Sequence, residues 1–206
     1  MGMKKILVMV DAGHGVETAG KQNPSGILRE YAWNRDCARV LLETLEHEPN
    51  IDGYYVVPEF SETDVPLSVR AQRVNYVCKN YKDQYDAFVL VSIHCNAHGD
   101  GKKYTEAHGW SVFTTRGKTA SDPIATAIFD VALKKFGKAN MRYDWSDGDP
   151  DWEANFYILR ETVCPAVLIE HFFMTNEEDF KYLISPQSVY DCAEVIVEGL
   201  KSYYHV

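Results

Sequence analysis

The chain has 206 residues, of which 46% are hydrophobic and 25% are charged, proportions that are ordinary for a soluble globular protein of one domain. Its formal net charge of −9 leaves no basic patch to neutralise phosphates, which argues against a nucleic-acid partner. The sequence also lacks an apolar run of the ~20 residues that a membrane span requires.

The N-terminus and the cysteines bear on where the protein is made. Two lysines precede the apolar run ILVMV, as in a signal peptide, but Asp11 ends this run. The run is shorter than the ~7–15 residues of a signal sequence, so we interpret it as a strand and expect synthesis in the cytoplasm without a leader. The five cysteines show neither a CxxC motif nor a disulfide framework, and buried free thiols fit a reducing compartment.

Strand-like and helical patterns alternate along the chain. Strands are predicted at 4–10, 53–58, 88–93, 109–114, 156–159 and 166–169. Helices are predicted at 34–47, up to 81, at 123–136 with Asp122 as the N-cap, after Asn176 and at 188–203. This alternation predicts an α/β fold in one domain over residues 1–206, with a twisted, mainly parallel sheet and helices on both faces.

The run 88–93, FVLVSI, is the most distinctive of the predicted strands. It is too short for a helix and apolar on both faces, which is typical of an inner strand of a parallel sheet. The run ends at His94. Because ligands of open α/β sheets bind outside the carboxyl ends of the strands, His94 is placed to bind something.

Three predicted strands end at a group that can titrate or bind a metal: His14, His94 and Glu170. Glu30 lies in the segment between the first strand and the first helix. If the three strands are neighbours, all four groups face one cleft. Two imidazoles and one carboxylate with an open fourth position form the ligand set of a catalytic zinc site, and the remaining carboxylate could act as a general base.

Other residues near these positions have weaker claims. Gly13 and Gly15 do not belong to a GxGxxG fingerprint, because Thr18 occupies the third position; they let the backbone turn around His14 instead. Cys95 should point away from the cleft if His94 points in. The second-choice ligands are His98 and His108, and His171 is expected to have a role in packing or in supporting a metal ligand from behind.

The acidic segment 144–153 is the least defined part of the sequence. It is most simply a solvated loop, and alternatively a loop that lines or covers a cleft. A calcium loop is less favoured, because the spacing departs from DxDxDG and no glutamate closes it. A carboxylate from this segment reaching the metal's open position is a further hypothesis.

Four motifs, taken together and in this order, resemble the zinc-dependent N-acetylmuramoyl-L-alanine amidases of the third amidase type. They are DAGHG at 11–15, LRE at 28–30, SIHCNAH at 92–98 and PAVLIEHFFMTN at 165–176. The resemblance extends to LSVRAQRVN at 67–75 and so covers nearly the whole chain. The departures, at Ala12, Cys95 and His171-Phe172, touch no predicted ligand. REYAWN and VLIEHFF are more similar to bacteriophage endolysins than to cell-division amidases.

The resemblance implies hydrolysis of the amide between N-acetylmuramic acid and L-alanine of peptidoglycan by a catalytic domain spanning residues 1–206. His14, Glu30 and His94 would hold Zn²⁺, and Glu170 would be the catalytic carboxylate. Asn96 and Arg160 are candidates for substrate contacts. We expect a monomer that acts on the cell wall after release through a membrane lesion.

Two alternatives remain open. One is another zinc hydrolase, such as a carboxypeptidase, on a similar sheet. The other is a peptidoglycan-binding protein that has lost turnover, against which the retained Glu170 speaks.

Overall fold

The strands of this protein assemble into a single sheet. A computed structural model describes residues 4–57 and 63–206. The elements in chain order are β1 (Ile6–Ala12), α1 (Glu30–Leu45), β2 (Ile51–Tyr55), α2 (Leu67–Tyr81), β3 (Ala87–Asn96), β4 (Ser111–Thr114), α3 (Asp122–Phe136), the 3-10 turn η1 (Lys138–Asn140), β5 (Trp152–Glu153), α4 (Tyr157–Arg160), β6 (Ala166–Phe173), α5 (Glu177–Leu183) and α6 (Gln187–Tyr204).

The sheet has the strand order β2-β1-β3-β6-β4-β5 within the part of the chain that the structure describes. The four strands from β2 to β6 run parallel to one another, whereas β4 runs antiparallel to β6 and β5 follows β4 in parallel. The predicted α/β fold with a mainly parallel sheet is therefore confirmed. As a result, the carboxyl ends of β1, β3 and β6 lie at one edge.

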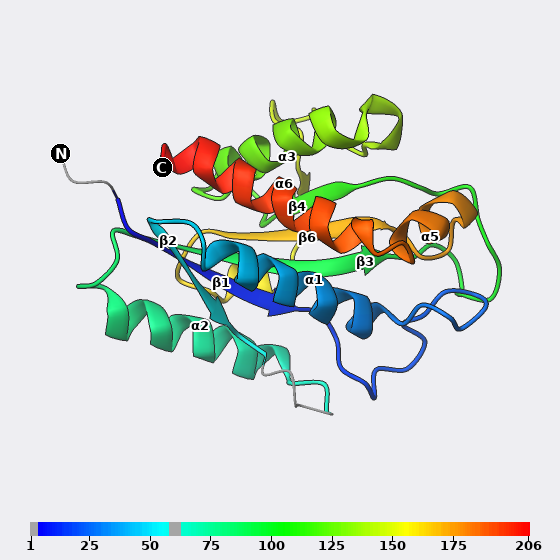
Figure 1. The fold of residues 1–206 in the computed structure, drawn as a ribbon, viewed down its shortest axis with the longest axis horizontal. Coiled ribbons are helices and arrows are strands. Elements are labelled where there is room, and N and C mark those ends of the chain that lie inside the picture. Colours follow the sequence, from blue (N-terminus) through cyan, green and yellow to red (C-terminus); the bar gives the residue numbers. More distant parts are fainter. Residues whose placement is uncertain (1–3, 58–62) are drawn as a thin grey trace.

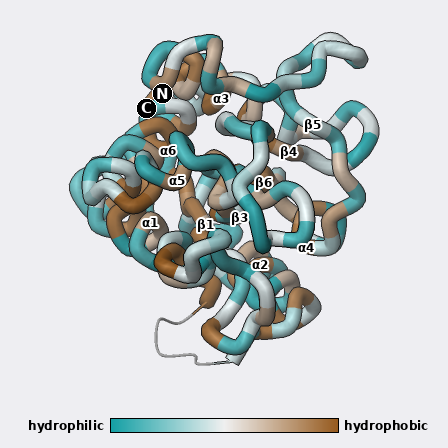
Figure 2. The backbone as a smooth tube through the Cα atoms, turned by 90° about the vertical axis from the view of Figure 1, so that its right-hand side faces the viewer, coloured by the Kyte–Doolittle hydropathy of each residue, from teal (hydrophilic) through white to brown (hydrophobic). Residues whose placement is uncertain are grey.

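Helices cover both faces of the sheet, with α1, α3 and α6 on one side and α2 on the other (Figure 1). Side chains of β1 alternate between these layers: Ile6, Val8 and Val10 join the cluster beneath α1 and α6, while Leu7 and Met9 join the cluster beneath α2. Because both faces are covered, the inner strands are apolar at successive positions. Figure 2 shows β1 and β3 between these layers from the end of the molecule.

Two helices match their predictions closely. Helix α3 ends at Phe136 as expected, with Gly137 directly after it. It begins one residue earlier than expected, because Ser121 is the N-cap and Asp122, the expected cap, is already helical, with Pro123 in the first turn. The side chain of Asn176 accepts hydrogen bonds from the backbone N–H groups of Glu178 and Asp179 and so caps α5.

Other elements differ from the predictions. Residues 156–159 were expected to form a strand. Instead, Phe156 is the N-cap of the short helix α4, and the other three residues are helical. Ile158 and Leu159 pack into the cluster beneath α2. A short apolar run cannot be assigned to a strand or a helix from periodicity alone. Helix α1 begins at Glu30, ahead of the predicted start at residue 34. Strand β2 covers Ile51–Tyr55, and Pro58, the last residue of the predicted strand, lies outside the described residues.

Among the described residues, no helix combines the length and the apolar character needed to cross a bilayer.

Candidate metal centre

The turn after β1 brings His14 to the edge of the sheet. Gly13 is required there, because a Cβ atom at this position would collide with the imidazole of His94. His14 itself has a φ of 66°, in the left-handed region that side chains other than glycine rarely adopt. Strain of this kind persists where the surrounding structure fixes a functional side chain.

A loop then returns the chain to the same edge and begins α1. Its ends are joined by a bridge between Gln22 and Arg29, and the backbone N–H of Glu30 donates to the carbonyl of Lys21 at 2.9 Å. Glu30, the first residue of α1, is 2% exposed. The carboxylate of Glu30 is therefore held inside the molecule next to the strand ends.

His14, Glu30 and His94 form a cluster whose nearest nitrogen and oxygen atoms all lie within 4.8 Å of one another. Oε1 of Glu30 is 3.3 Å from Nε2 of His14 and 3.1 Å from Nδ1 of His94. The two imidazoles are nearly perpendicular, at 88°, with centroids 5.0 Å apart. Two imidazoles thus converge on one carboxylate oxygen.

The electrostatics of the cluster depend on this convergence. Burial alone would raise the pKa of Glu30, but hydrogen bonds and charge interactions with His14 and His94 outweigh it and hold the pKa well below its ordinary value. Burial would likewise lower the pKa of His94, but the Glu30 carboxylate outweighs it and raises the pKa. Glu30 is consequently an anion, the form that binds a cation.

Glu170 lies beside this cluster because β3 and β6 pair with His94 opposite Glu170. Its Oε2 atom is shielded from solvent and has no hydrogen-bond partner in the described structure. Burial raises the pKa of Glu170 to about 7, and the nearby Glu30 carboxylate adds to the shift. A carboxyl with such a pKa can accept and return a proton near neutral pH.

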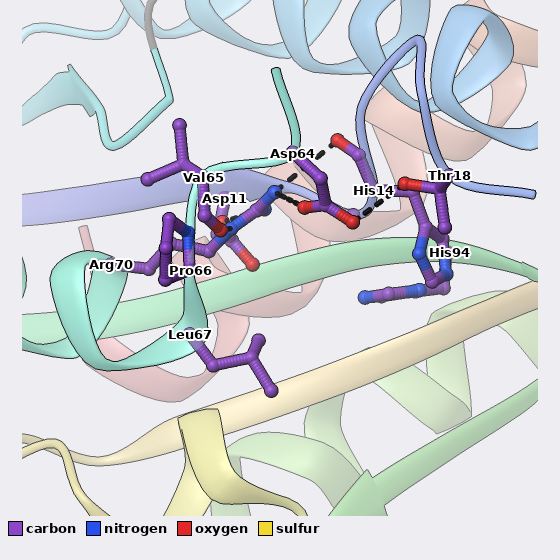
Figure 3. A pocket seen from close by; sticks show the side chains of 10 residues that line it. Asp11, His14, Thr18, Asp64, Val65, Pro66, Leu67, Arg70 and His94 are labelled. Atoms are coloured by element: carbon purple, nitrogen blue, oxygen red, sulfur yellow. Dashed lines mark hydrogen bonds and ion pairs between the residues drawn. The ribbon is translucent and has the colours of Figure 1, made fainter.

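Arg70 supports the turn that carries His14. Its guanidinium is 1% exposed and donates to the carboxylate of Asp11 at 2.7 Å and to the carbonyl of His14 at 3.2 Å. It also binds Asp64 at 3.0 Å (Figure 3). On the other side, the buried amide of Asn34 donates to the carbonyl of Gly13 at 3.0 Å. The turn is thus fixed from both α2 and α1.

A cavity of about 470 Å³ opens beside the imidazoles. His14 and His94 form part of its wall (Figure 3). The half-exposed Leu67 at the start of α2 also lines it. A substrate in this cavity would contact the cluster directly.

The remaining histidines do not join the cluster. The backbone N–H of His98 bonds to Thr175, and the ring of His108 approaches the carbonyls of Glu106 and Ala139. His171 is fully buried and accepts a hydrogen bond from the indole of Trp110, in agreement with the packing role expected for it. Burial lowers the pKa of His171 to about 3, so its ring is neutral.

The acidic segment lies elsewhere. Asp147, Asp149 and Glu153 line a cavity with Gly117 and Asp122, next to the start of α3. Ser121, beside Asp122, accepts a hydrogen bond from the backbone of Ala166 at the beginning of β6. The cavity therefore lies near the amino end of β6, whereas Glu170 lies further along this strand, toward its carboxyl end. The contacts of the described residues thus do not support the hypothesis that this segment covers the cluster.

Asp11, Asn34 and Arg70 support the site, although their roles were not expected from the sequence. Arg70 could have signalled a buried ion pair, because it lies on the face of α2 that carries the buried residues Val74 and Val77. The partner could not have been found, since Asp11 and Arg70 meet only in the folded chain.

Comparisons with known proteins identify the family of this chain. The family described as N-acetylmuramoyl-L-alanine amidase, Amidase_3, matches residues 8–202. Two curated relatives are N-acetylmuramoyl-L-alanine amidases AmiC. The Escherichia coli protein is 27% identical, and the match covers 98% of this chain and 53% of that protein. The Neisseria meningitidis protein is 25% identical, and the match covers 97% of this chain and 53% of that protein. The chain thus spans about half the length of these relatives.

Solved structures of similar proteins cover the whole fold. An N-acetylmuramoyl-L-alanine amidase from Clostridium difficile 630 superposes with a TM-score of 0.76 at 26% identity, covering 97% of both chains. The catalytic domain of the CD27L endolysin, which targets Clostridia difficile, superposes with a TM-score of 0.63 at 25% identity, again over 97% of both chains.

Proposed function

This chain belongs to the Amidase_3 family of N-acetylmuramoyl-L-alanine amidases, and we propose that it is a zinc-dependent peptidoglycan amidase. Its substrate in this proposal is the amide between N-acetylmuramic acid and the L-alanine of the stem peptide, and residues 1–206 form the catalytic domain. The observation that carries the proposal is the convergence of His14, Glu30 and His94 beside the unpartnered carboxyl of Glu170.

The donor set of the cluster fits zinc. Two imidazole nitrogens and one carboxylate oxygen are ligands of catalytic zinc sites, which keep a fourth position open. Donors bound to one zinc ion at ~2.0–2.2 Å lie roughly 3.3 Å apart in a tetrahedral arrangement. Glu30 Oε1 already lies at such distances from the two imidazoles, 3.3 Å and 3.1 Å. The donor atoms as a set lie within 4.8 Å of one another, so binding of one ion would draw the most distant pair closer together.

In the proposed mechanism, His14, Glu30 and His94 hold the zinc ion. When bound there, zinc supplies a Lewis acid that polarises the scissile carbonyl and lowers the pKa of water. Glu170 accepts the proton of the attacking water at Oε2, the atom without a partner, and returns it to the nitrogen of the leaving L-alanine. Arg70 keeps the His14 turn in place while the substrate occupies the adjacent cavity.

The endolysin-like resemblance leads to a proposal about biological setting. The CD27L catalytic domain has the same fold over nearly all of this chain. We propose that this protein likewise acts on the bacterial cell wall, reaching it through a membrane lesion, and that the catalytic unit works as a monomer.

Digestion of purified peptidoglycan tests this function. The proposal predicts soluble stem peptides with a free N-terminal L-alanine and glycan strands with an intact lactyl group, both identified by mass spectrometry. Release of a C-terminal amino acid from the stem would instead indicate a carboxypeptidase. Retention on the wall with no released product would indicate a binding protein without turnover.

A further inference from the structure

Two of the five cysteines lie against each other on the face of the sheet that α2 covers. Cys78 is in the last turn of α2, and Cys164 lies just before β6. Both pack at the edge of the cluster beneath α2 and line one surface pocket of about 350 Å³. The two thiols interact with each other, which lowers the pKa of Cys78 and raises that of Cys164. The two sulfur atoms are thus neighbours, although 86 positions separate them in the sequence.

The backbone around the pair is held in register by Asn75, one turn before Cys78 on the same helix face. The amide of Asn75 donates to the carbonyl of Glu161 at 2.8 Å, and its oxygen accepts from the backbone N–H of Val163 at 2.8 Å. Residues three apart on a helix are neighbours on its surface, so this clamp sets Cys164 opposite Cys78. Hydrogen bonds of the Asn75 side chain, which do not involve sulfur, therefore hold the two cysteine-bearing segments together.

The other three cysteines have a different environment. Cys37, Cys95 and Cys192 are buried in the cluster on the opposite face of the sheet. Burial raises the pKa of each of these thiols, which suppresses the thiolate that reacts. Cys78, in contrast, is partly exposed, and the interaction with Cys164 lowers its pKa.

We propose that Cys78 and Cys164 are a site of oxidative modification, at which a low-molecular-weight disulfide such as oxidised glutathione generates an intramolecular disulfide. The Cys78 thiolate attacks one sulfur of the oxidant and releases one thiol, leaving a mixed disulfide on Cys78. Cys164 then loses its proton, attacks the Cys78 sulfur and releases the second thiol. The protein loses two electrons and two protons, and the oxidant gains both.

The resulting bond would tie the end of α2, the helix that carries Arg70, to the entrance of β6, the strand that carries Glu170. A disulfide that closes a long loop restricts the unfolded chain and so stabilises the folded one. The cytoplasm keeps such a pair reduced, whereas an oxidising exterior lets it close. This inference does not depend on the proposed amidase activity.

Peptide mapping tests the site directly. Trypsin cleaves after Arg73 and Lys79 and after Arg160 and Lys181, which isolates Cys78 in peptide 74–79 and Cys164 in peptide 161–181. After incubation of the folded protein with oxidised glutathione, we expect these two peptides to be joined and the other three cysteines to remain alkylatable. Oxidation should raise Tm by on the order of 5–10 °C, a shift that dithiothreitol reverses.

Variants separate the two steps. In Cys164→Ser, the reaction should stop at a glutathione adduct on Cys78. In Cys78→Ser, Cys164 should remain unmodified. Both variants should keep the Tm of the reduced parent after treatment with oxidised glutathione. The proposal is overturned if the parent retains all five thiols, if it accumulates the adduct on Cys78 without the joined peptides, or if a different pair of cysteines is joined.

Discussion

The guanidinium of Arg70 lies 2.7 Å from the carboxylate of Asp11, and both side chains are only 1% exposed. Asp11 also accepts a hydrogen bond from the hydroxyl of Ser92 at 2.7 Å, which links β1 to β3. The ion pair therefore joins α2 to the two strands that present the imidazoles. Arg70 also donates to the carbonyls of Ala12 and His14, which connects α2 to the turn that carries His14.

Replacing Arg70 with methionine should destabilise the protein by about 3–5 kcal/mol, because the buried Asp11 carboxylate would lose its partner. Urea denaturation measures this change. Lys79→Met on the exposed face of α2 is the control and should change the free energy of unfolding by less than about 0.5 kcal/mol. Equal stabilities of the two variants would refute the structural role of the ion pair.

Gly13→Ala should weaken zinc binding by about 10-fold or more, because the added methyl group displaces the His94 imidazole. Competition with a chromophoric chelator gives the affinity. Gly117→Ala is a control for a general loss of stability: alanine is strained there because the φ of Gly117 is 84°, but the added Cβ meets nothing within 4 Å, so zinc affinity should stay that of the parent. If both variants bind zinc as the parent does, Gly13 does not control the position of His94.

Asp151 should make stability depend on pH. Burial is the main reason that its pKa rises to about 7, and the neighbouring Asp149 carboxylate adds to the shift. Because the folded state binds the proton more tightly, the stabilisation from this proton is complete below about pH 4 and is lost as pH rises through 7. The contribution of Asp151 to the free energy of unfolding of the parent should therefore fall as pH rises from about 4 through 7.

Asp151→Asn mimics the protonated carboxyl and should unfold at a higher denaturant concentration than the parent at pH 8, with a smaller difference at pH 5. Asp147→Asn, an exposed change in the same segment, should follow the parent at both values. A pH profile of Asp151→Asn that superimposes on that of the parent would contradict this assignment.

Glu170→Gln should reduce kcat on peptidoglycan by ~10²–10⁴-fold while zinc content stays unchanged, because an amide cannot accept the proton of water. Quantified release of N-terminal alanine gives the rate. Glu177→Gln, an exposed change at the start of α5, should retain the parent rate. Full activity of Glu170→Gln would remove Glu170 from the mechanism.

The strand ends could be predicted from sequence because they depend on local patterns. Apolar runs that stop at His14, His94 and Glu170 indicate both buried strands and the edge at which their side chains gather. Once the strands pair as β1-β3-β6, the meeting of these groups follows from topology.

Features that depend on contacts across the fold could not be predicted. Glu30 was expected upstream of its helix, yet it is the first helical residue, fixed by the return of its loop to Lys21. The scattered spacing of the cysteines concealed the meeting of Cys78 with Cys164, which depends on how α2 docks against residues 161–164. In each case the deciding partner is distant in sequence.

The measurement that tests the central claim most directly is the zinc stoichiometry and affinity of the metal-free protein, determined by calorimetry and elemental analysis. The parent should bind one zinc ion per chain, and Glu30→Gln should bind at least about 100-fold more weakly, while the exposed change Glu43→Gln on the same helix should bind as the parent does. Zinc bound by Glu30→Gln with the parent's stoichiometry and affinity would contradict the proposed ligand set.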